Sequence, residues 1–195
     1  MTLTALDDVG QAALFTDART ANTFTSEPVT AAELDAIWEL ARWAPTSANT
    51  QPMRVLYLHP GPGRSRLLPH MNEGNRAKTA TAPAVAVLAM DSRFHENIPA
   101  VLPELQDVFD ANESLRTETA RFGAALQAGY FILAVRSLGL AAGPMAGFNA
   151  EGVNAEFYPD GRFRSALIVN IGHPAKDAWR GRLPSLDSDL VVQHL

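Results

Sequence analysis

The sequence has 195 residues, 47% of them hydrophobic, with a formal net charge of -5 and no cysteine. A chain of this length fits a single domain, expected to span residues 1–195, and can bury a substantial core. The acidic balance disfavours a nucleic-acid or anionic-membrane surface, and the lack of cysteine excludes disulfides, thiol nucleophiles and iron–sulfur clusters.

The N-terminal segment carries Asp7 and Asp8 and no basic residue before Arg19, which is the reverse of a secretory signal. The longest clean apolar run, Ala82 to Met90, is too short to cross a bilayer. The sequence therefore predicts a cytoplasmic protein that uses neither a membrane nor a nucleic acid as a partner.

Thr30 and Glu33 form a capping box that predicts the first clear helix. Apolar residues then recur at helical spacing as far as Pro45: Leu34, Ile37, Trp38 and Ala41. The next stretch, residues 45–52 (PTSANTQP), is polar and lies between two prolines, so it is predicted to be a loop.

Three short apolar runs bounded by turn residues predict buried strands: Met53 to Leu58, Pro83 to Met90 and Arg164 to Ile171. Between the last two, residues 113–138 predict the longest helix, which Gly139 would end. Residues 123–135 are almost entirely apolar, so this helix is predicted to be buried, either in the core or at a helix–helix dimer contact. Helices and strands do not alternate regularly, which favours an α+β fold.

Several common catalytic patterns are absent from the sequence. It has no G-x-S-x-G or Walker A motif, and its five histidines lack the i, i+4 spacing of a helical zinc site. Residues 61–66 (GPGRSR) begin like a dinucleotide fingerprint, but Arg66 stands at the third glycine position, so a plain turn is predicted. The sequence thus argues against a metal enzyme, a serine hydrolase and a P-loop NTPase.

Polar and basic residues gather instead in five separated segments. Residues 17–24 (DARTANTF), 45–52, 75–78 (NRAK), 143–148 (GPMAGF) and 180–184 (RGRLP) form this set. Asn75 and Lys78 are spaced to share one face of a helical turn, and the glycines of residues 143–148 would let backbone lie close to a flat ligand. Taken singly, each segment is typical of an ordinary loop or solvated face.

In their order along nearly the whole chain, the five segments resemble the FMN-dependent nitroreductase family. Within it, LFTDART, WAPTSAN, LGLAAGPMAGF and RLP are most similar to the branch that includes the malonic-semialdehyde reductase of bacterial pyrimidine breakdown. The resemblance implies an α+β fold with an antiparallel or mixed sheet flanked by helices. It also implies a long central helix at a homodimer interface and one FMN per subunit.

The resemblance also assigns the cofactor-binding residues. Arg19, Arg180 and Arg182 match residues that hold the FMN phosphate, for which a planar guanidinium is well suited. Thr20 and Asn22 match positions next to the phosphate, and Asn75 and Lys78 match positions that reach the polar edge of the flavin ring. Ala146 and Gly147 match the place where backbone comes close to the N5 atom of the ring. A loop that in relatives comes from the second subunit matches Pro45, Thr46, Ser47 and Asn49.

The implied activity is ping-pong hydride transfer from NADH or NADPH to a small 3-oxo acid such as malonic semialdehyde, which gives 3-hydroxypropionate. The alternatives are a general nitroaromatic or quinone reductase, and a protein that binds flavin for storage or sensing without turnover. No catalytic side chain is assigned, because the flavin carries the chemistry. Ala146 stands where several nitroreductases have an acid, and Gly123-Ala124-Ala125 where close relatives are expected to have Asn-Ser-Ser. These departures leave the substrate open.

Overall fold

The computed structural model describes residues 4–195 and places the three predicted strands in one antiparallel sheet of order β1-β2-β4-β3. These strands are β1 (Met53–Leu58), β2 (Ala84–Asp91) and β4 (Phe163–Gly172). The sequence did not predict the fourth, β3 (Ala141–Met145), whose run AAGPM contains a glycine and a proline. Proline removes a hydrogen-bond donor, and β3 accommodates one because it lies at the edge of the sheet.

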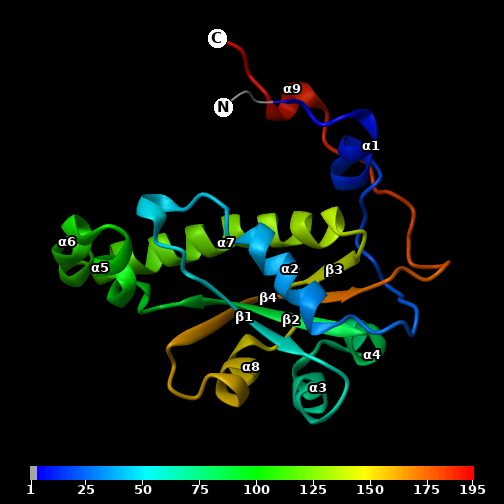
Figure 1. The fold of residues 1–195 in the computed structure, drawn as a ribbon, viewed down its shortest axis with the longest axis horizontal. Coiled ribbons are helices and arrows are strands. Elements are labelled where there is room, and N and C mark those ends of the chain that lie inside the picture. The colour runs from blue at the N-terminus through cyan, green and yellow to red at the C-terminus, as the bar shows by residue number, and fades with distance from the viewer. Residues whose placement is uncertain (1–3) are drawn as a thin grey trace.

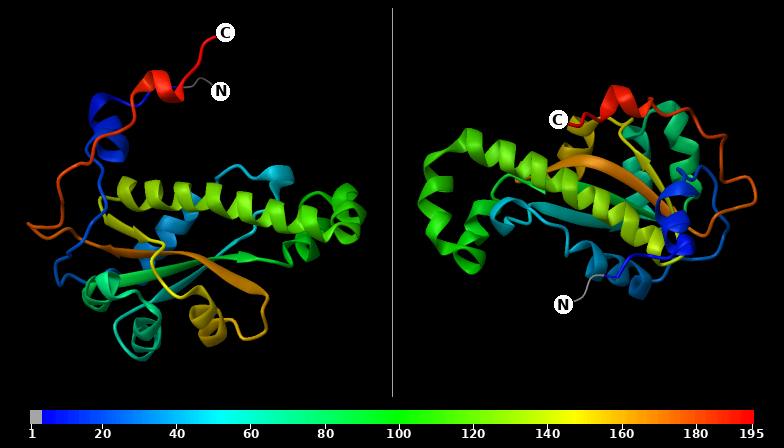
Figure 2. Two further views of the ribbon diagram at one scale, coloured as in Figure 1. Left: turned by 180° about the vertical axis from the view of Figure 1, so that it is seen from behind. Right: turned by 90° about the horizontal axis from the view of Figure 1, so that it is seen from above.

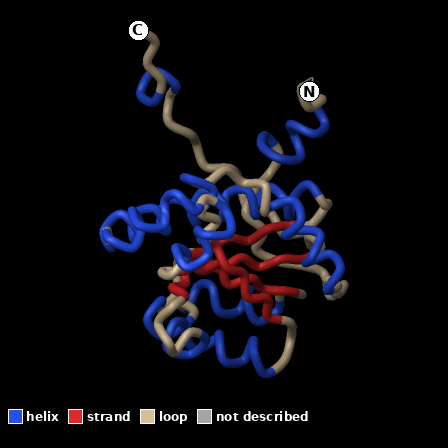
Figure 3. Tube along the Cα trace, turned by 60° about the vertical axis from the view of Figure 1, so that its left-hand side comes forward, coloured by secondary structure: helices blue, strands red, loops and turns tan. Residues whose placement is uncertain are grey.

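Helices cover both faces of the sheet, as Figure 3 shows. On one face lie α2 (Ala31–Ala41) and α7 (Glu113–Ser137); on the other lie α3 (Pro62–Leu67), α4 (Glu73–Thr81) and α8 (Ala150–Phe157) (Figures 1 and 2). The short helices α5 (Ile98–Val101) and α6 (Gln106–Ala111) precede α7. Near the chain ends, α1 (Asp8–Gln11) and α9 (Ser188–Val191) extend away from the sheet (Figure 1). Within residues 4–195, no helix combines the length and apolar character that crossing a membrane requires.

Strand β2 shows why both faces need cover. Ala84 and Leu88 belong to the core beneath α2 and α7, whereas Val85 and Val87 belong to the core on the side of α3 and α8. Side chains alternate across a strand, so a continuous apolar run suits a strand whose two faces are both covered. The predicted α+β class, with an antiparallel sheet flanked by helices, is confirmed.

The first predicted helix is confirmed as α2. Thr30 is its N-cap, and both hydrogen bonds of the capping box with Glu33 are present. The helix ends at Ala41, one turn before Pro45, because the chain turns sharply at residues 42–44.

The predicted plain turn at residues 61–66 is wrong, because helix α3 begins there at Pro62. Gly61 precedes it with a φ of 136°, a conformation that favours glycine. Proline suits the first position of a helix, where the missing N–H has no helical partner. The pattern that resembled a fingerprint is therefore a helix start.

The longest predicted helix is confirmed as α7, but only one side of it is buried. Gly123, Gln127 and Phe131 face the core, with Gln127 and Phe131 0% exposed. On the other side Phe122 is 64% exposed and Tyr130 42% exposed. The prediction that this helix is buried in the core thus holds for one of its faces. The other apolar face is left uncovered in a single chain.

A buried arginine on α3 joins three elements beside the sheet. The Arg64 side chain is 3% exposed, and its Nη1 donates to the carbonyls of Thr79 (2.8 Å) and Ala82 (2.7 Å). Its Nη2 donates to the carbonyl of Leu58 at 2.6 Å. Burial lowers the pKa of Arg64 to about 10, so the group is charged at neutral pH. Arg64 therefore fixes the end of α4 against the end of β1.

Replacing Arg64 with methionine should test this link. The Arg64→Met variant keeps an apolar stem but leaves three buried carbonyls without a donor, so the free energy of unfolding should fall by about 3 kcal/mol or more. The matched control is Arg42→Met, because Arg42 forms an exposed pair with Glu39 and should contribute less than about 1 kcal/mol. Urea denaturation followed by circular dichroism measures both, and equal small losses would contradict the role of Arg64.

Candidate functional site

The structure brings five of the predicted site residues together around one cavity. Its volume is about 370 Å³, and Arg19, Thr20, Asn22, Arg180 and Arg182 line it. The N-terminal segment reaches this place because it runs beside β3, where the Ala21 amide donates to the carbonyl of Ala142 at 2.9 Å. The Asn22 amide donates to the carbonyl of Ala178 at 3.0 Å, which joins the C-terminal segment to the N-terminal one.

We call Arg19, Arg180 and Arg182 the arginine clamp. Two of them also donate hydrogen bonds to the backbone around this cavity. Arg19 Nη1 donates to the carbonyl of Arg180 at 3.2 Å, and Arg182 Nη2 donates to the carbonyls of Thr16 and Ala18. Among residues 4–195 these bonds use one nitrogen of Arg19 and one of Arg182, and none of Arg180. The other N–H groups stay available for an anion, and bidentate guanidinium donors suit a phosphate or carboxylate.

Helix α4 places Asn75 and Lys78 beside the clamp. Burial, and then the positive charge of Arg180, lower the pKa of Lys78, so these two cations lie close enough to repel each other. Asn75 Nδ2 donates to the carbonyl of Gly147 at 2.9 Å. A Cβ at Gly147 would lie 2.6 Å from that Nδ2, so a larger residue here would displace the Asn75 side chain. Four of the five predicted segments therefore meet at this end of the molecule, with Ala146 next to Gly147.

The fifth segment lies elsewhere. Pro45, Thr46, Ser47 and Asn49 belong to a loop that packs on the first half of α7, where a Cβ at Gly123 would meet Pro52 at 2.9 Å and Thr46 at 3.6 Å. Figures 1 and 2 show this loop and the clamp toward opposite ends of α7. A single chain thus does not bring these four residues to the clamp.

The backbone of this loop is strained. Ala48, Asn49 and Gln51 have φ values of 50°, 53° and 44°, in the left-handed region that residues other than glycine adopt only at a cost. The Gln51 amide donates to Thr46 Oγ1 at 3.2 Å, and the Gln51 side chain donates to Asn49 Oδ1 at 3.0 Å. These bonds hold the tight conformation in place. Gly123 lets the loop lie directly against α7.

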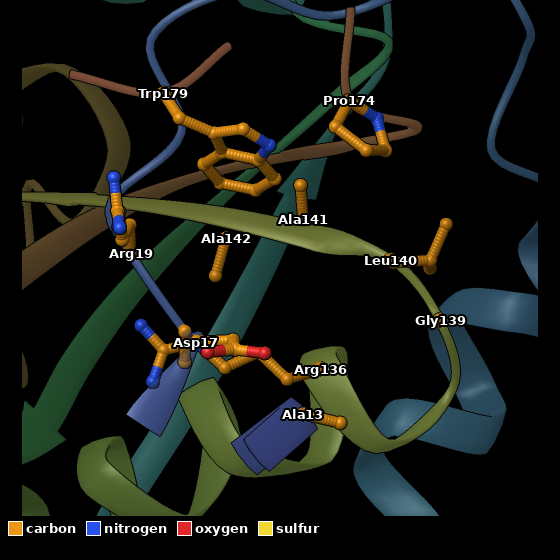
Figure 4. A pocket seen from close by; sticks show the side chains of 11 residues that line it. Ala13, Asp17, Arg19, Arg136, Gly139, Leu140, Ala141, Ala142, Pro174 and Trp179 are labelled. Carbon is orange, nitrogen blue, oxygen red and sulfur yellow. The ribbon is translucent and has the colours of Figure 1, made fainter. Parts of the chain in front are cut away.

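A smaller cavity beside the clamp contains residues that the sequence analysis missed. It has a volume of about 170 Å³ and shares Arg19 with the clamp. Figure 4 shows Trp179 and Pro174 on one side of it, and Asp17 and Arg136 on the other. Arg136 follows the apolar residues 123–135 in the last turn of α7, and Trp179 directly precedes Arg180; these positions were the available signals. Burial lowers the pKa of Arg136.

The arrangement favours binding chemistry over side-chain catalysis. Within residues 4–195, no group of three or more acidic or histidine side chains could hold a metal ion. The side chains that converge are arginines, a lysine and amides, which bind anions and orient polar edges. The close backbone approach at Gly147 adds a surface on which a flat group could lie.

Comparisons with known proteins agree with this geometry. The sequence profile of the Nitroreductase family matches residues 16–173. A protein of Streptomyces coelicolor, provisionally named NADH dehydrogenase/NAD(P)H nitroreductase, is 59% identical over 178 residues, which cover 90% of this chain and 88% of the relative.

Solved structures show the same fold. A nitroreductase-like protein of Bacillus subtilis has a TM-score of 0.83 at 21% identity, over 93% of this chain and 97% of the other. A protein of Exiguobacterium sibiricum, solved as a complex with FMN and provisionally named a nitroreductase, has a TM-score of 0.82 at 19% identity and covers 100% of each chain.

Proposed function

The chain belongs to the nitroreductase family, and from this premise we propose that it binds FMN in the arginine clamp and reduces a small 3-oxo acid with NADH or NADPH. Membership of the family confirms the predicted enzyme class, an FMN-dependent NAD(P)H oxidoreductase. The observation that carries the proposed site is a cavity lined by three arginines from two separated segments, with two further segments placed beside it by Lys78 and Asn75.

The donor set fits a flavin mononucleotide. The N–H groups of Arg19, Arg180 and Arg182 that hold no backbone carbonyl would pair with the phosphate oxygens. A bound anion would also relieve the repulsion between Lys78 and Arg180. Gly147 would offer close backbone contact because it has no side chain, and a larger residue there would displace Asn75.

Bound FMN would supply a ring that accepts and returns a hydride, so the protein needs no nucleophile of its own. Within the proposal, Lys78 places a positive charge near the polar edge of the ring. Asn75 is held in position by its bond to the carbonyl of Gly147 at 2.9 Å. The residues of this chain thus bind, orient and set the local charge.

We further propose a homodimer in which two α7 helices pack antiparallel. The uncovered face of α7 carries Phe122 and Tyr130, with the small residues Ala125 and Gly129 between them. An exposed apolar face of this kind is typical of an interface. Gly123, beside the loop, and Arg136, beside the clamp, are 13 positions apart, which is about 20 Å of helix. A two-fold axis between them would bring the loop of one chain to the clamp of the other.

The proposed substrate rests on the resemblance to the malonic-semialdehyde branch, because membership of the family alone does not specify a substrate. A 3-oxo acid is small and anionic, so its carboxylate needs a cationic contact, which Lys78 could provide. Nitroaromatics and quinones are the alternative acceptors. A flavin-storage or sensing protein is the alternative without turnover.

The clamp can be tested by replacing its arginines. Arg180→Gln and Arg182→Gln should each weaken FMN binding about tenfold or more, because each loses charge-assisted hydrogen bonds of about 1.5–3 kcal/mol. Arg42→Gln is the control, since Arg42 is exposed and pairs with Glu39. Flavin absorbance after dialysis, and titration of apoprotein with FMN, measure the effect. Unchanged retention in both clamp variants would reject the site.

The dimer can be tested at Gly129, where a Cβ would meet no atom within 4 Å of the single chain. Gly129→Arg should therefore fold but give a monomer that loses flavin, because it places a charge at the proposed helix contact. Ala155→Arg, at an exposed position of α8 on the other side of the sheet, should remain a dimer with flavin. Analytical ultracentrifugation distinguishes the two states. A Gly129→Arg dimer with bound FMN would contradict the proposed interface.

The reaction can be tested by steady-state kinetics with either nicotinamide and three acceptors. If donor and acceptor use one pocket in turn, double-reciprocal plots should give parallel lines, with malonic semialdehyde as the preferred acceptor. A hundredfold preference for a nitroaromatic or quinone, about 2.7 kcal/mol of transition-state binding, would favour a general reductase. Flavin reduction without acceptor turnover would favour storage or sensing.

A further inference from the structure

A second cationic cavity lies near the start of α7, toward the opposite end of that helix from the clamp. It has a volume of about 470 Å³. The turn after β2, the first two turns of α7 and the start of β4 form its walls. Figure 1 shows α5 and α6 beside this end of α7. No residue of the clamp lines it, so the two cavities of one chain are separate.

Three arginines line this cavity without acidic partners. Arg93, Arg116 and Arg164 form no ion pair with any residue in the range 4–195. Glu96 also lines the cavity, but its carboxylate is paired with Arg162 at 3.0 Å. The remaining carboxylate in the lining is Glu113. Positive charge is therefore in excess here, in a protein whose net charge is -5.

The acidic group nearest in sequence to Arg93 is also engaged elsewhere. Asp91 is 0% exposed and accepts hydrogen bonds from Arg54 at 2.8 Å and from Arg162 at 3.1 Å. Its Oδ1 also accepts from the Arg93 backbone amide at 2.9 Å. This bond fixes the Arg93 backbone but leaves its guanidinium uncompensated.

Hydrogen bonds hold the Arg116 guanidinium in place, and the strand register places Arg164 at the cavity. Arg116 Nη1 donates to the carbonyls of Phe109 at 2.5 Å and Asp110 at 2.9 Å, at the end of α6. Arg164 lies opposite Met90 in the register of β2 and β4, and both line the cavity. Sites built on helices and strands hold their geometry better than sites on loops.

We propose that this cavity binds the oxyanion group, a carboxylate or a phosphate, of a small metabolite. Three guanidinium groups that line one cavity without acidic partners can each donate charge-assisted hydrogen bonds to an oxyanion. Met90 and Ala120 add an apolar wall for the carbon part of the ligand. The proposal goes beyond the flavin site and does not depend on it.

Calorimetric titration of the purified full-length protein tests the proposal, with malonate and inorganic phosphate as separate probes. We expect saturable binding of at least one probe. Arg93→Gln and Arg164→Gln should each weaken it about tenfold or more. Arg116 is left unchanged because its hydrogen bonds complete the end of α6. Tighter malonate binding would identify a carboxylate ligand, and tighter phosphate binding a phosphate ligand.

Two controls separate this cavity from the clamp. Arg42→Gln should bind the probe as the unmodified protein does, because it changes the net charge equally at a distant exposed site. Arg180→Gln should keep the probe but lose FMN, whereas Arg93→Gln and Arg164→Gln should keep FMN and lose the probe. The proposal is overturned if neither probe binds saturably, if binding is unchanged in both cavity variants, or if only Arg180→Gln abolishes it. Failure of the clamp to bind FMN would leave this result unaffected.

Discussion

The half-buried state of α7 is the constraint on which the other features depend. One face of the helix fills the core between α2 and the sheet, while Phe122 and Tyr130 stay exposed on the other. The same helix carries a strained loop against Gly123 and approaches the arginine clamp near Arg136. Covering the apolar face with a second copy of the chain would therefore also complete the site.

Polar contacts hold the parts of the site on this frame. Arg64 fixes the end of α4 against the end of β1, so that Asn75 and Lys78 face the clamp. Hydrogen bonds between the N-terminal and C-terminal segments bring Arg19 to Arg180 and Arg182. At the other end of the sheet, Asp91 pairs with Arg54 and Arg162. The three arginines that line the second cavity form no ion pair within residues 4–195. The fold thus gathers arginines around two separate cavities of an acidic protein.

Local features of the sequence were predictable, and features that depend on distant contacts were not. The capping box at Thr30 and the apolar runs of β1, β2 and β4 are local signals, so these elements were found. Strand β3 was missed because Gly143 and Pro144 oppose strand formation, and edge pairing with β4 overrides them. The burial of only one side of α7 could not be read from residues 123–135, because they are apolar on every side of the helix. The meeting of Arg19 and Arg180 was predicted only through the resemblance, because 161 positions separate them.

Complementation between two damaged chains tests most directly whether two chains share each flavin site. One chain would carry Arg180→Gln and Arg182→Gln, and the other Ser47→Trp, which blocks the loop at an exposed position. Flavin content would be measured in the purified heterodimer and in both variant homodimers. If clamp and loop come from different chains, the heterodimer contains one intact site and binds one FMN, while the homodimers bind none. A heterodimer without FMN, or a Ser47→Trp homodimer that keeps its full FMN content, would contradict the account.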